Sequence, residues 1–292
     1  MSQAFGKPLA KETQADISRW IFRECGVVLG PDKAYLLEHR LAGLLKDFAL
    51  PSYEALRDRL VDGRQPGLAE RVVEAIVTHE TSFFRDRHPF EALKTAILPA
   101  ARQRWLADRG ASLLPPRPIR LWSAACSTGQ EPVSLAITVL EWLRAGMAAD
   151  LRATDFQVVA TDISARILKQ AREGRFSAAE LERGLPAELR ARYFTADGPG
   201  WVVSPEVARL IDYRRLNFAD PVPPSAGMFD IVFCRNVLIY FDEALKRRVV
   251  EEFWRSLPPG GILVLGSAES LYGISDRFLS VTMGGSPVYQ RI

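Results

Sequence analysis

The chain has 292 residues, of which 48% are hydrophobic and 25% are charged, values typical of a globular protein with a substantial core and one or two domains. Its formal net charge of +3 is too small to indicate a nucleic-acid partner. No apolar run reaches the ~18 residues that span a membrane, and the first twenty residues contain no apolar signal-peptide core.

The cysteines and histidines indicate a reducing compartment and no metal. Cys25, Cys126 and Cys234 are far apart in the sequence. An odd, sparse set without an export signal predicts free thiols and a cytoplasmic protein. The three histidines lack metal-ligand spacing, so we expect no metal site.

Residues 10 to about 108 are predicted to be helical. Apolar residues recur at helical spacing, with arginines on the other faces. The first two apolar stripes are Ile17, Trp20, Ile21 and Cys25, then Leu37, Leu41, Leu44, Leu45 and Phe48. A further helix over 89–106 is expected to bend near Pro99. Three prolines predict a linker over 110–118, between a helical domain at 1–109 and a second domain at 119–292.

The second domain alternates between strand-like and helical stretches. Apolar runs at 119–123, 157–161, 229–234 and 262–266 flank helical stretches at 131–145, 164–173 and 243–257. This alternation predicts an α/β fold with a doubly wound, Rossmann-like parallel sheet. The segment 174–216 is too broken for a crossover helix and predicts a small antiparallel β insertion. Residues 280–292 are expected to form a final hairpin.

The turn after the first strand predicts a ligand site. Ligands of doubly wound sheets bind outside the carboxyl ends of the strands, and small residues at 124–129 let a ligand approach the backbone. The only glycine there is Gly129, whereas a pyrophosphate usually requires more. Asp162 ends the next strand and either accepts hydrogen bonds from a ribose diol or caps the helix at 164–173. An S-adenosyl group, with a ribose and no phosphate, fits this set better than a dinucleotide.

Four stretches in order resemble the CheR-type chemotaxis receptor methyltransferases, which depend on S-adenosylmethionine. They are "THETSFFRD" (78–86), "WSAACSTGQEPVSLA" (122–136), "ATDIS" (160–164) and "FCRNVLIYFD" (233–242), with "GSAESL" (266–271) as a looser fifth match. The resemblance extends from about residue 15 to the C-terminus. It implies an all-helical N-terminal domain before a methyltransferase domain with a β insertion.

The resemblance also implies the cofactor-binding residues. These are His79, where the family often has Asn, together with Thr81, Arg85, Ala124 in the turn, Glu131, Asp162, Asn217, Phe218, Arg235 and Asn236. Arg85 and Tyr240 match the two side chains that the family places near the reactive methyl, and are the predicted catalytic residues. From the residues alone, "RNVLIYFD" could equally be a strand-to-helix junction capped by Asp242, with Tyr240 a half-buried aromatic.

The function implied is methyl transfer from S-adenosylmethionine to glutamate carboxylates of chemoreceptors, giving γ-glutamyl methyl esters and S-adenosylhomocysteine. Two alternatives are a methyltransferase of the same fold with another protein or a small carboxylic acid as substrate, and a non-catalytic regulator that binds S-adenosylmethionine. The expected partners are cytoplasmic receptor helices, with no membrane insertion. The compact "YFTADGPGWVV" at 193–203 predicts no tight binding of a receptor C-terminal pentapeptide. The arginines at 40, 57, 59, 64 and 71 are either a solvated helix face or a docking surface.

Overall fold

The computed structural model describes residues 9–111, 117–221 and 227–292, so most of the predicted proline linker lies outside the described residues. The contacts divide the chain into two compact units. The N-terminal unit contains residues 1–79, 217–220 and 240–245, and the sheet unit contains 80–216, 221–239 and 246–292. The division after His79 falls earlier than the boundary predicted at 110–118, because residues 83–105 contribute to the core of the sheet unit.

The N-terminal unit is helical, as its apolar periodicity predicts. Its main helices are α1 (Lys11–Cys25), α2 (Ala34–Asp47), α3 (Tyr53–Asp62) and α4 (Leu68–Ile76), with a short 3₁₀ turn at Pro31–Lys33. The predicted stripes of α1 and α2 are buried except at Phe48, which follows the end of α2 and is partly exposed. Ile17, Ile21, Leu37 and Leu41 are fully inaccessible. Burial of each such aliphatic side chain contributes roughly 1.5–3 kcal/mol.

Two later segments belong to the same unit. Helix α1 ends at Gly26, whose φ is 74°, and a Cβ there would lie 2.1 Å from Cδ2 of Leu245. Only glycine therefore permits both the left-handed backbone and the close approach. The Val28 N–H donates to the Tyr240 carbonyl at 2.9 Å, and the rings of Phe218 and Phe241 pack edge to face.

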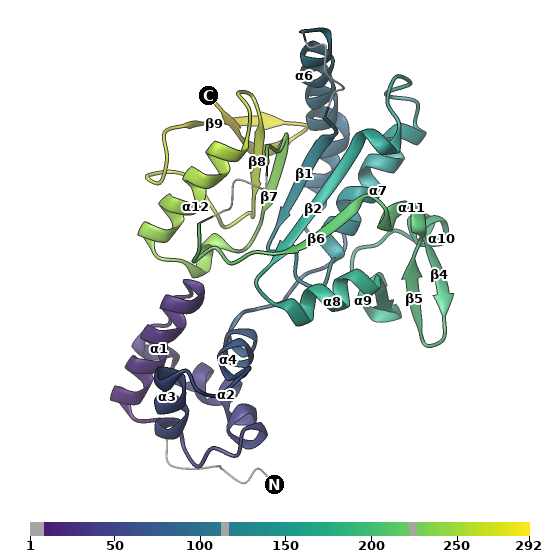
Figure 1. Ribbon diagram of the computed structural model, residues 1–292. Coiled ribbons are helices and arrows are strands. Elements are labelled where there is room, and N and C mark those ends of the chain that lie inside the picture. The colour runs from purple at the N-terminus through teal and green to yellow at the C-terminus, as the bar shows by residue number, and fades with distance from the viewer. Residues whose placement is uncertain (1–8, 112–116, 222–226) are drawn as a thin grey trace. The chain divides into compact units, whose positions relative to one another are not determined.

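The sheet unit contains a seven-stranded sheet in the order β6-β2-β1-β7-β8-β10-β9 (Figure 1). Its strands are β1 (Ile119–Ala124), β2 (Phe156–Asp162), β6 (Ile211–Arg215), β7 (Ile231–Cys234), β8 (Ile262–Leu265), β9 (Phe278–Met283) and β10 (Ser286–Arg291). The first five pair in parallel, and the β9–β10 hairpin is antiparallel. The predicted Rossmann-like sheet and final hairpin are confirmed.

The predicted β insertion is present but shorter than expected. A separate antiparallel sheet contains β3 (Arg175–Ser177), β5 (Gly200–Val203) and β4 (Phe194–Asp197) in that order. Helices α9 (Ala178–Glu182), α10 (Ala187–Tyr193) and α11 (Pro205–Ala208) complete it. The prediction that it extends to residue 216 is wrong, because β6 joins the main sheet beside β2. As a half-buried edge strand with polar residues, β6 lacks the apolar run of a central strand.

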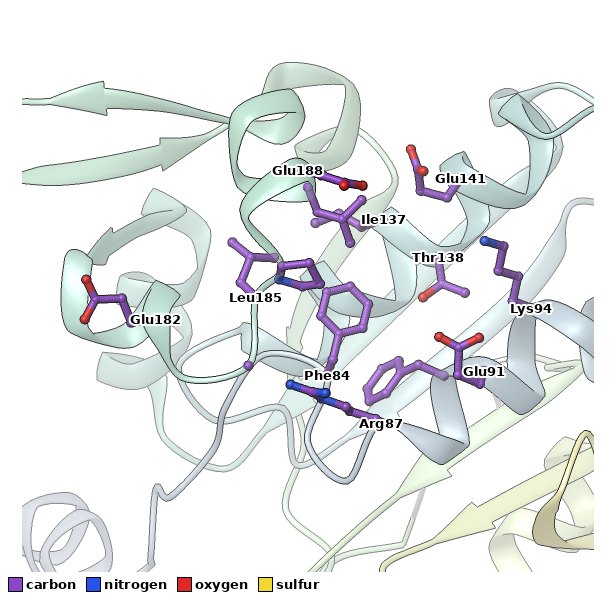
Figure 2. Close-up of a pocket in the computed structure, with 14 residues that line it drawn as sticks. Phe84, Arg87, Glu91, Lys94, Ile137, Thr138, Glu141, Glu182, Leu185 and Glu188 are labelled. Carbon is purple, nitrogen blue, oxygen red and sulfur yellow. The ribbon is translucent and has the colours of Figure 1, made fainter.

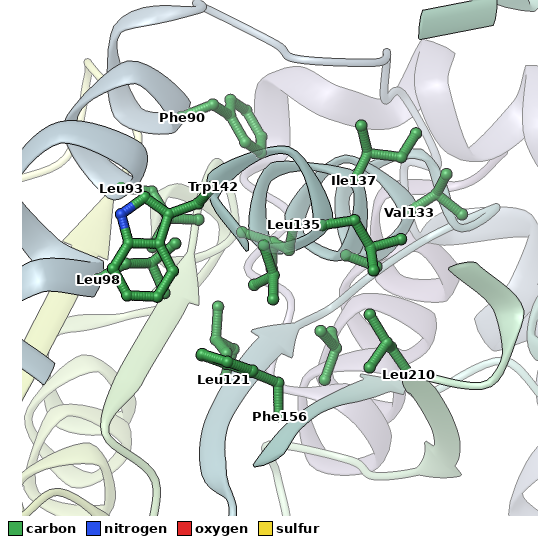
Figure 3. Packing of buried hydrophobic residues seen from close by; sticks show 14 of the residues in the cluster. Phe90, Leu93, Leu98, Leu121, Val133, Leu135, Ile137, Trp142, Phe156 and Leu210 are labelled. Atoms are coloured by element: carbon green, nitrogen blue, oxygen red, sulfur yellow. The ribbon is translucent and has the colours of Figure 1, made fainter. Parts of the chain in front are cut away.

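Helix α7 (Gln130–Arg144) lies at the centre of the core. Leu121 and Phe156 of the sheet pack beneath it, and Phe90 and Leu93 pack alongside (Figure 3). The latter two come from α5 (His88–Ala92) and a π-helical turn at Leu93–Ile97, which leads into α6 (Leu98–Ala111). The π turn ends just before Pro99, where the sequence predicts a bend. Trp122 and Trp142 are almost fully buried.

The remaining elements are α8 (Ala165–Glu173), α12 (Glu243–Ser256) and two 3₁₀ turns at Ala153–Asp155 and Leu238–Tyr240. Within the described part of the chain, no helix has the length and apolar character needed to cross a membrane.

The thiols provide a test of the fold. All three cysteines are free and buried, and burial raises the pKa of the Cys25 thiol to about 11. Burial also raises the pKa values of Cys126 and Cys234 well above the ordinary value. We expect iodoacetamide at pH 8 to modify fewer than one thiol per native chain and all three in denaturant, because the thiolate is the reactive form. Mass spectrometry counts the adducts, and rapid native labelling of Cys126 or Cys234 would contradict this packing.

Candidate functional site

Three turns form the candidate site at the carboxyl ends of β2, β1 and β7. These strands are neighbours and parallel, so the residues that follow them meet at one edge of the sheet. The turn after β1 is Ala125–Gly129, Asp162 ends β2, and Arg235 and Asn236 follow β7.

The turn after β1 adopts a tight backbone conformation although it contains a single glycine. Ala125 and Ser127 have φ values of 64° and 51°, a conformation that costs a non-glycine residue roughly 1–2 kcal/mol. Gly129, with φ of 97°, is required for packing, because a Cβ there would lie 3.1 Å from Cβ of Ala171 and 3.2 Å from the Tyr213 hydroxyl. Gly129 is therefore required for the close packing of α8 and β6, and it does not indicate a phosphate-binding loop.

Asp162 holds this turn in place. Its side chain is nearly inaccessible. Its Oδ2 accepts from the Ser127 N–H at 2.9 Å, and its Oδ1 accepts from the Ser164 N–H at 3.0 Å. The cap of α8 is Ser164, which accepts from Ile167 N–H, so the alternative in which Asp162 caps that helix is not what the structure contains. Each carboxylate oxygen retains a second acceptor position, which a ribose hydroxyl could use.

Arg235 is an almost fully enclosed charge of the site. Its side chain is 2% exposed. One terminal nitrogen, Nη2, donates to the Arg85 carbonyl at 2.8 Å and to Oδ2 of Asp86 at 2.6 Å. The other, Nη1, donates to Oε2 of Glu131 at 3.4 Å. The guanidinium therefore links the turn after β7 to α7 and to the loop before α5.

Glu131 lies in the first turn of α7 beside this arginine. Burial raises the pKa of Glu131, opposed by the Arg235 charge, by the hydrogen bond from the Ser123 hydroxyl and by the more distant Arg85 charge. The Ser123 bond is 2.8 Å long. Neutralisation by Arg235 makes a buried carboxylate at this position tolerable.

The loop Phe84–Arg87 is strained and carries Arg85. Phe84, Asp86 and Arg87 have φ values of 48°, 66° and 52°. Of the seven non-glycine residues with positive φ in the described chain, six lie in this loop, in the turn after β1 or at Asn236. Such strain persists only where surrounding contacts determine the conformation. Among them, the Phe84 N–H donates to Oγ of Ser134, and Nδ1 of His88 pairs with Oγ of Ser286.

Arg85 itself is half-buried, and its Nη1 donates to the Glu80 carbonyl at 3.1 Å. The structure brings together, at this edge of the sheet unit, the predicted residues Arg85, Ala124, Glu131, Asp162, Arg235 and Asn236. Thr81 is half-buried in the same unit.

The other predicted residues, His79, Asn217, Phe218 and Tyr240, belong to the N-terminal unit. Within that unit, the Asn217 side chain is already engaged: its Nδ2 donates to the Glu24 carbonyl at 2.7 Å, and its Oδ1 accepts from the Ala219 N–H. Tyr240 is 36% exposed.

One buried polar atom of the sheet unit fits an S-adenosyl ligand. Oδ1 of Asn236 has no hydrogen-bond partner among the described residues. An amide oxygen that accepts nothing suits an ammonium or amino group, and S-adenosylmethionine carries both. The small side chains of Ala124 and of the turn beside it let a ligand approach the backbone, so the residues present fit this cofactor.

Glu269 is an important residue that the sequence analysis missed. Its Oε1 accepts from the N–H groups of Val237 and Leu238, and its Oε2 accepts from those of Asn236 and Gly266, all at 2.8 Å. One carboxylate thus fixes the turn after β7. The available signal was its place in "GSAESL", four residues after the buried strand β8.

A cavity of about 590 Å³ lies next to the strained loop (Figure 2). Phe84 and Arg87 line it, with Ile137 of α7 and Leu185 of the insertion, whereas Arg85 and Asp86 are the loop residues that engage Arg235. None of the predicted cofactor residues lines this cavity, so it is distinct from the candidate site.

Comparison with known proteins gives a consistent family match. Residues 14–77 match the model "CheR methyltransferase, all-alpha domain", and residues 79–284 match "CheR methyltransferase, SAM binding domain". The chain is 40% identical over 269 residues to chemotaxis protein methyltransferase 1 of Pseudomonas aeruginosa, covering 92% of this chain and 93% of that protein. It is 39% identical over 285 residues to the chemotaxis protein methyltransferase of Vibrio parahaemolyticus, covering 97% and 98%. The Escherichia coli protein of that name is 32% identical, with coverage of 94% and 88%.

Replacing Glu269 tests its role in the turn. Glu269→Gln keeps the shape but replaces one acceptor oxygen with a donor that faces backbone N–H groups. Hydrogen bonds to charged groups contribute about 1.5–3 kcal/mol each, so we expect the free energy of unfolding of the sheet unit to fall by about 2–4 kcal/mol. Urea denaturation measures the change. The exposed Glu188→Gln is the control, and equal stability of the two variants would remove Glu269 from this role.

Proposed function

The chain belongs to the CheR methyltransferase family, and from this premise we propose that it methylates glutamate side chains of chemoreceptors as a protein-glutamate O-methyltransferase. Membership makes it an S-adenosylmethionine-dependent methyltransferase of chemotaxis signalling. The choice of a glutamate carboxylate, the roles of individual residues and the receptor contacts are proposals.

The observation that carries this proposal is that the carboxylates of the site are already engaged. Glu131 bonds Ser123 and Arg235, and Asp162 bonds two backbone amides. Asp86 accepts from Arg235 and from the Ser267 hydroxyl. None of these three acids is therefore presented as a general base, which suits a nucleophile that arrives ionised. A glutamate, with a pKa near 4.3, meets this condition at neutral pH.

The chemistry follows from this arrangement. When bound, S-adenosylmethionine supplies a methyl group on a sulfonium, which is already electrophilic. Arg85 would bind the substrate carboxylate through its guanidinium, and the Tyr240 hydroxyl would donate to one carboxylate oxygen and aim the other. Asp162 and Asn236 would hold the cofactor. Catalysis then consists of positioning and of removing water from the carboxylate.

The arginines of the N-terminal unit limit where a receptor helix would dock. Arg40 donates to the Ile76 carbonyl at the end of α4, Arg57 pairs with Asp58, and Arg71 pairs with Asp47. We propose that Arg59 and Arg64, which have no such partners among the described residues, contribute most to an acidic receptor helix.

We also propose that the β insertion does not bind a receptor C-terminal pentapeptide tightly. Strands β4 and β5 are joined by only Gly198 and Pro199. This connection is too short to supply contacts of its own to a peptide.

The product identifies the nucleophile. A γ-glutamyl methyl ester hydrolyses in mild alkali and releases methanol, whereas N-methyl and S-methyl products are stable. Label transferred from methyl-tritiated S-adenosylmethionine to a receptor cytoplasmic fragment should become volatile after alkali treatment. A fragment with its glutamates replaced by alanine is the control, and label that remains on the protein would exclude a carboxylate product.

The Tyr240 hydroxyl is tested by Tyr240→Phe, which keeps the ring. A hydrogen bond to a charged group contributes about 1.5–3 kcal/mol, so kcat should fall about tenfold to a hundredfold. S-adenosylhomocysteine affinity, measured by calorimetry, should remain within about twofold because the phenol contacts the substrate. Tyr272→Phe is the matched control, since Tyr272 is 95% exposed. Unchanged turnover in Tyr240→Phe would remove this hydroxyl from the mechanism.

A further inference from the structure

We propose that Arg235 is a positioning residue for Arg85: its guanidinium holds the strained loop that presents Arg85 and does not serve as a direct ligand of the cofactor. This inference rests on the proposed role of Arg85 in binding the substrate carboxylate. It assigns Arg235 a different role from the cofactor contact that the resemblance implies.

The first argument is how the guanidinium is used. Nη2 donates to the main-chain carbonyl of Arg85 and to the side chain of the next residue, Asp86. These two acceptors are adjacent in the chain, so one nitrogen fixes both the peptide orientation and the side chain at the centre of the loop. Nη1 is turned towards Glu131. Both terminal nitrogens are therefore committed to protein acceptors.

The second argument is burial. The Arg235 side chain is 2% exposed, and its guanidinium lies 5.7 Å from the centre of the Phe90 ring, at the start of the helix that follows the loop. A charge this enclosed cannot turn towards a ligand without breaking its bonds to Arg85 and Asp86. Its Nε is buried as well and has no hydrogen-bond partner among the described residues.

The third argument is that the loop needs such a support. Phe84, Asp86 and Arg87 all have positive φ, which unrestrained residues of these types rarely adopt. Phe83 and Phe84 are fixed by ring packing and by Ser134. At Arg85 and Asp86, the side-chain contacts are those of Arg235, the Ser267 hydroxyl and the Arg85–Glu80 bond, and one backbone bond runs from the His88 N–H to the Asp86 carbonyl. Loss of Arg235 would therefore free the part of the loop that carries the Arg85 side chain.

A double-mutant cycle separates positioning from the other roles. Arg235→Lys keeps the charge but cannot make the forked set of bonds. We expect kcat for a receptor fragment to fall roughly tenfold or more in the Arg235→Lys enzyme. When Arg235→Lys is added to Arg85→Ala, kcat should fall less than about threefold further, because the Arg85 side chain that Arg235 positions is already absent. S-adenosylhomocysteine affinity should change less than about threefold in both backgrounds. Equal losses of kcat in the two backgrounds, or a loss of affinity with unchanged kcat, would overturn the proposal.

A second variant covers the possibility that Arg235→Lys does not fold. Asp86→Asn, at a side chain that is 35% exposed, removes the carboxylate from the same bond, and its loss of kcat should also disappear in the Arg85→Ala background. Arg102→Lys alters the ion pair between Arg102 of α6 and Asp150. It is the matched control and should leave kcat unchanged. Full activity of Arg85→Ala alone would refute the role proposed for Arg85, whereas a loss there together with additive effects of Arg235→Lys would refute only the positioning role.

Discussion

The buried guanidinium of Arg235 is the contact on which the arrangement of the site depends. It follows β7, yet its partners lie on α7 and in the loop before α5. Three segments distant in the sequence are thereby fixed relative to one charge. Removal of the arginine would leave Glu131 buried without its neutralising partner, which is more costly than never having formed the pair. A charge so placed specifies one geometry and makes alternatives unfavourable.

Carboxylates support the backbone of this site in a second way. Asp162 accepts hydrogen bonds from two backbone amides and Glu269 accepts four. Each turn at the sheet edge therefore has a carboxylate within it. Backbone N–H groups in a turn have no ladder to join, and a charged acceptor satisfies several at once. Fewer acidic side chains are therefore free to bind a ligand than the number of acids in the motifs suggests.

The fold was predictable from periodicity because its elements bury regular apolar faces. The runs at 119–123 and 262–266 became central parallel strands, and the stripes of α1 and α2 became buried. Strand β6 was missed because an edge strand carries charges such as Asp212 and Arg214, which pair with each other. The boundary was misplaced because helical periodicity is the same whether a helix packs on other helices or, like α6, on a sheet.

The site was only partly predictable. Motifs identified Arg85, Glu131, Asp162 and Arg235, but no pattern distinguishes a side chain that touches a ligand from one that holds a neighbouring loop. Asn217 was expected to contact the cofactor, and both polar atoms of its side chain are engaged by the backbone. Glu269 escaped notice because its partners are main-chain amides, which leave no trace in side-chain composition.

The use of alanine and serine in left-handed positions of the turn after β1 has a consequence for affinity. A glycine-rich loop is mobile before a ligand arrives and loses backbone freedom when it binds. Ala125 and Ser127, the second of which is bonded to Asp162, have few other conformations open to them once the chain has folded. The conformational entropy of this segment is thus lost during folding, and the encounter with a small ligand requires little additional ordering of the main chain.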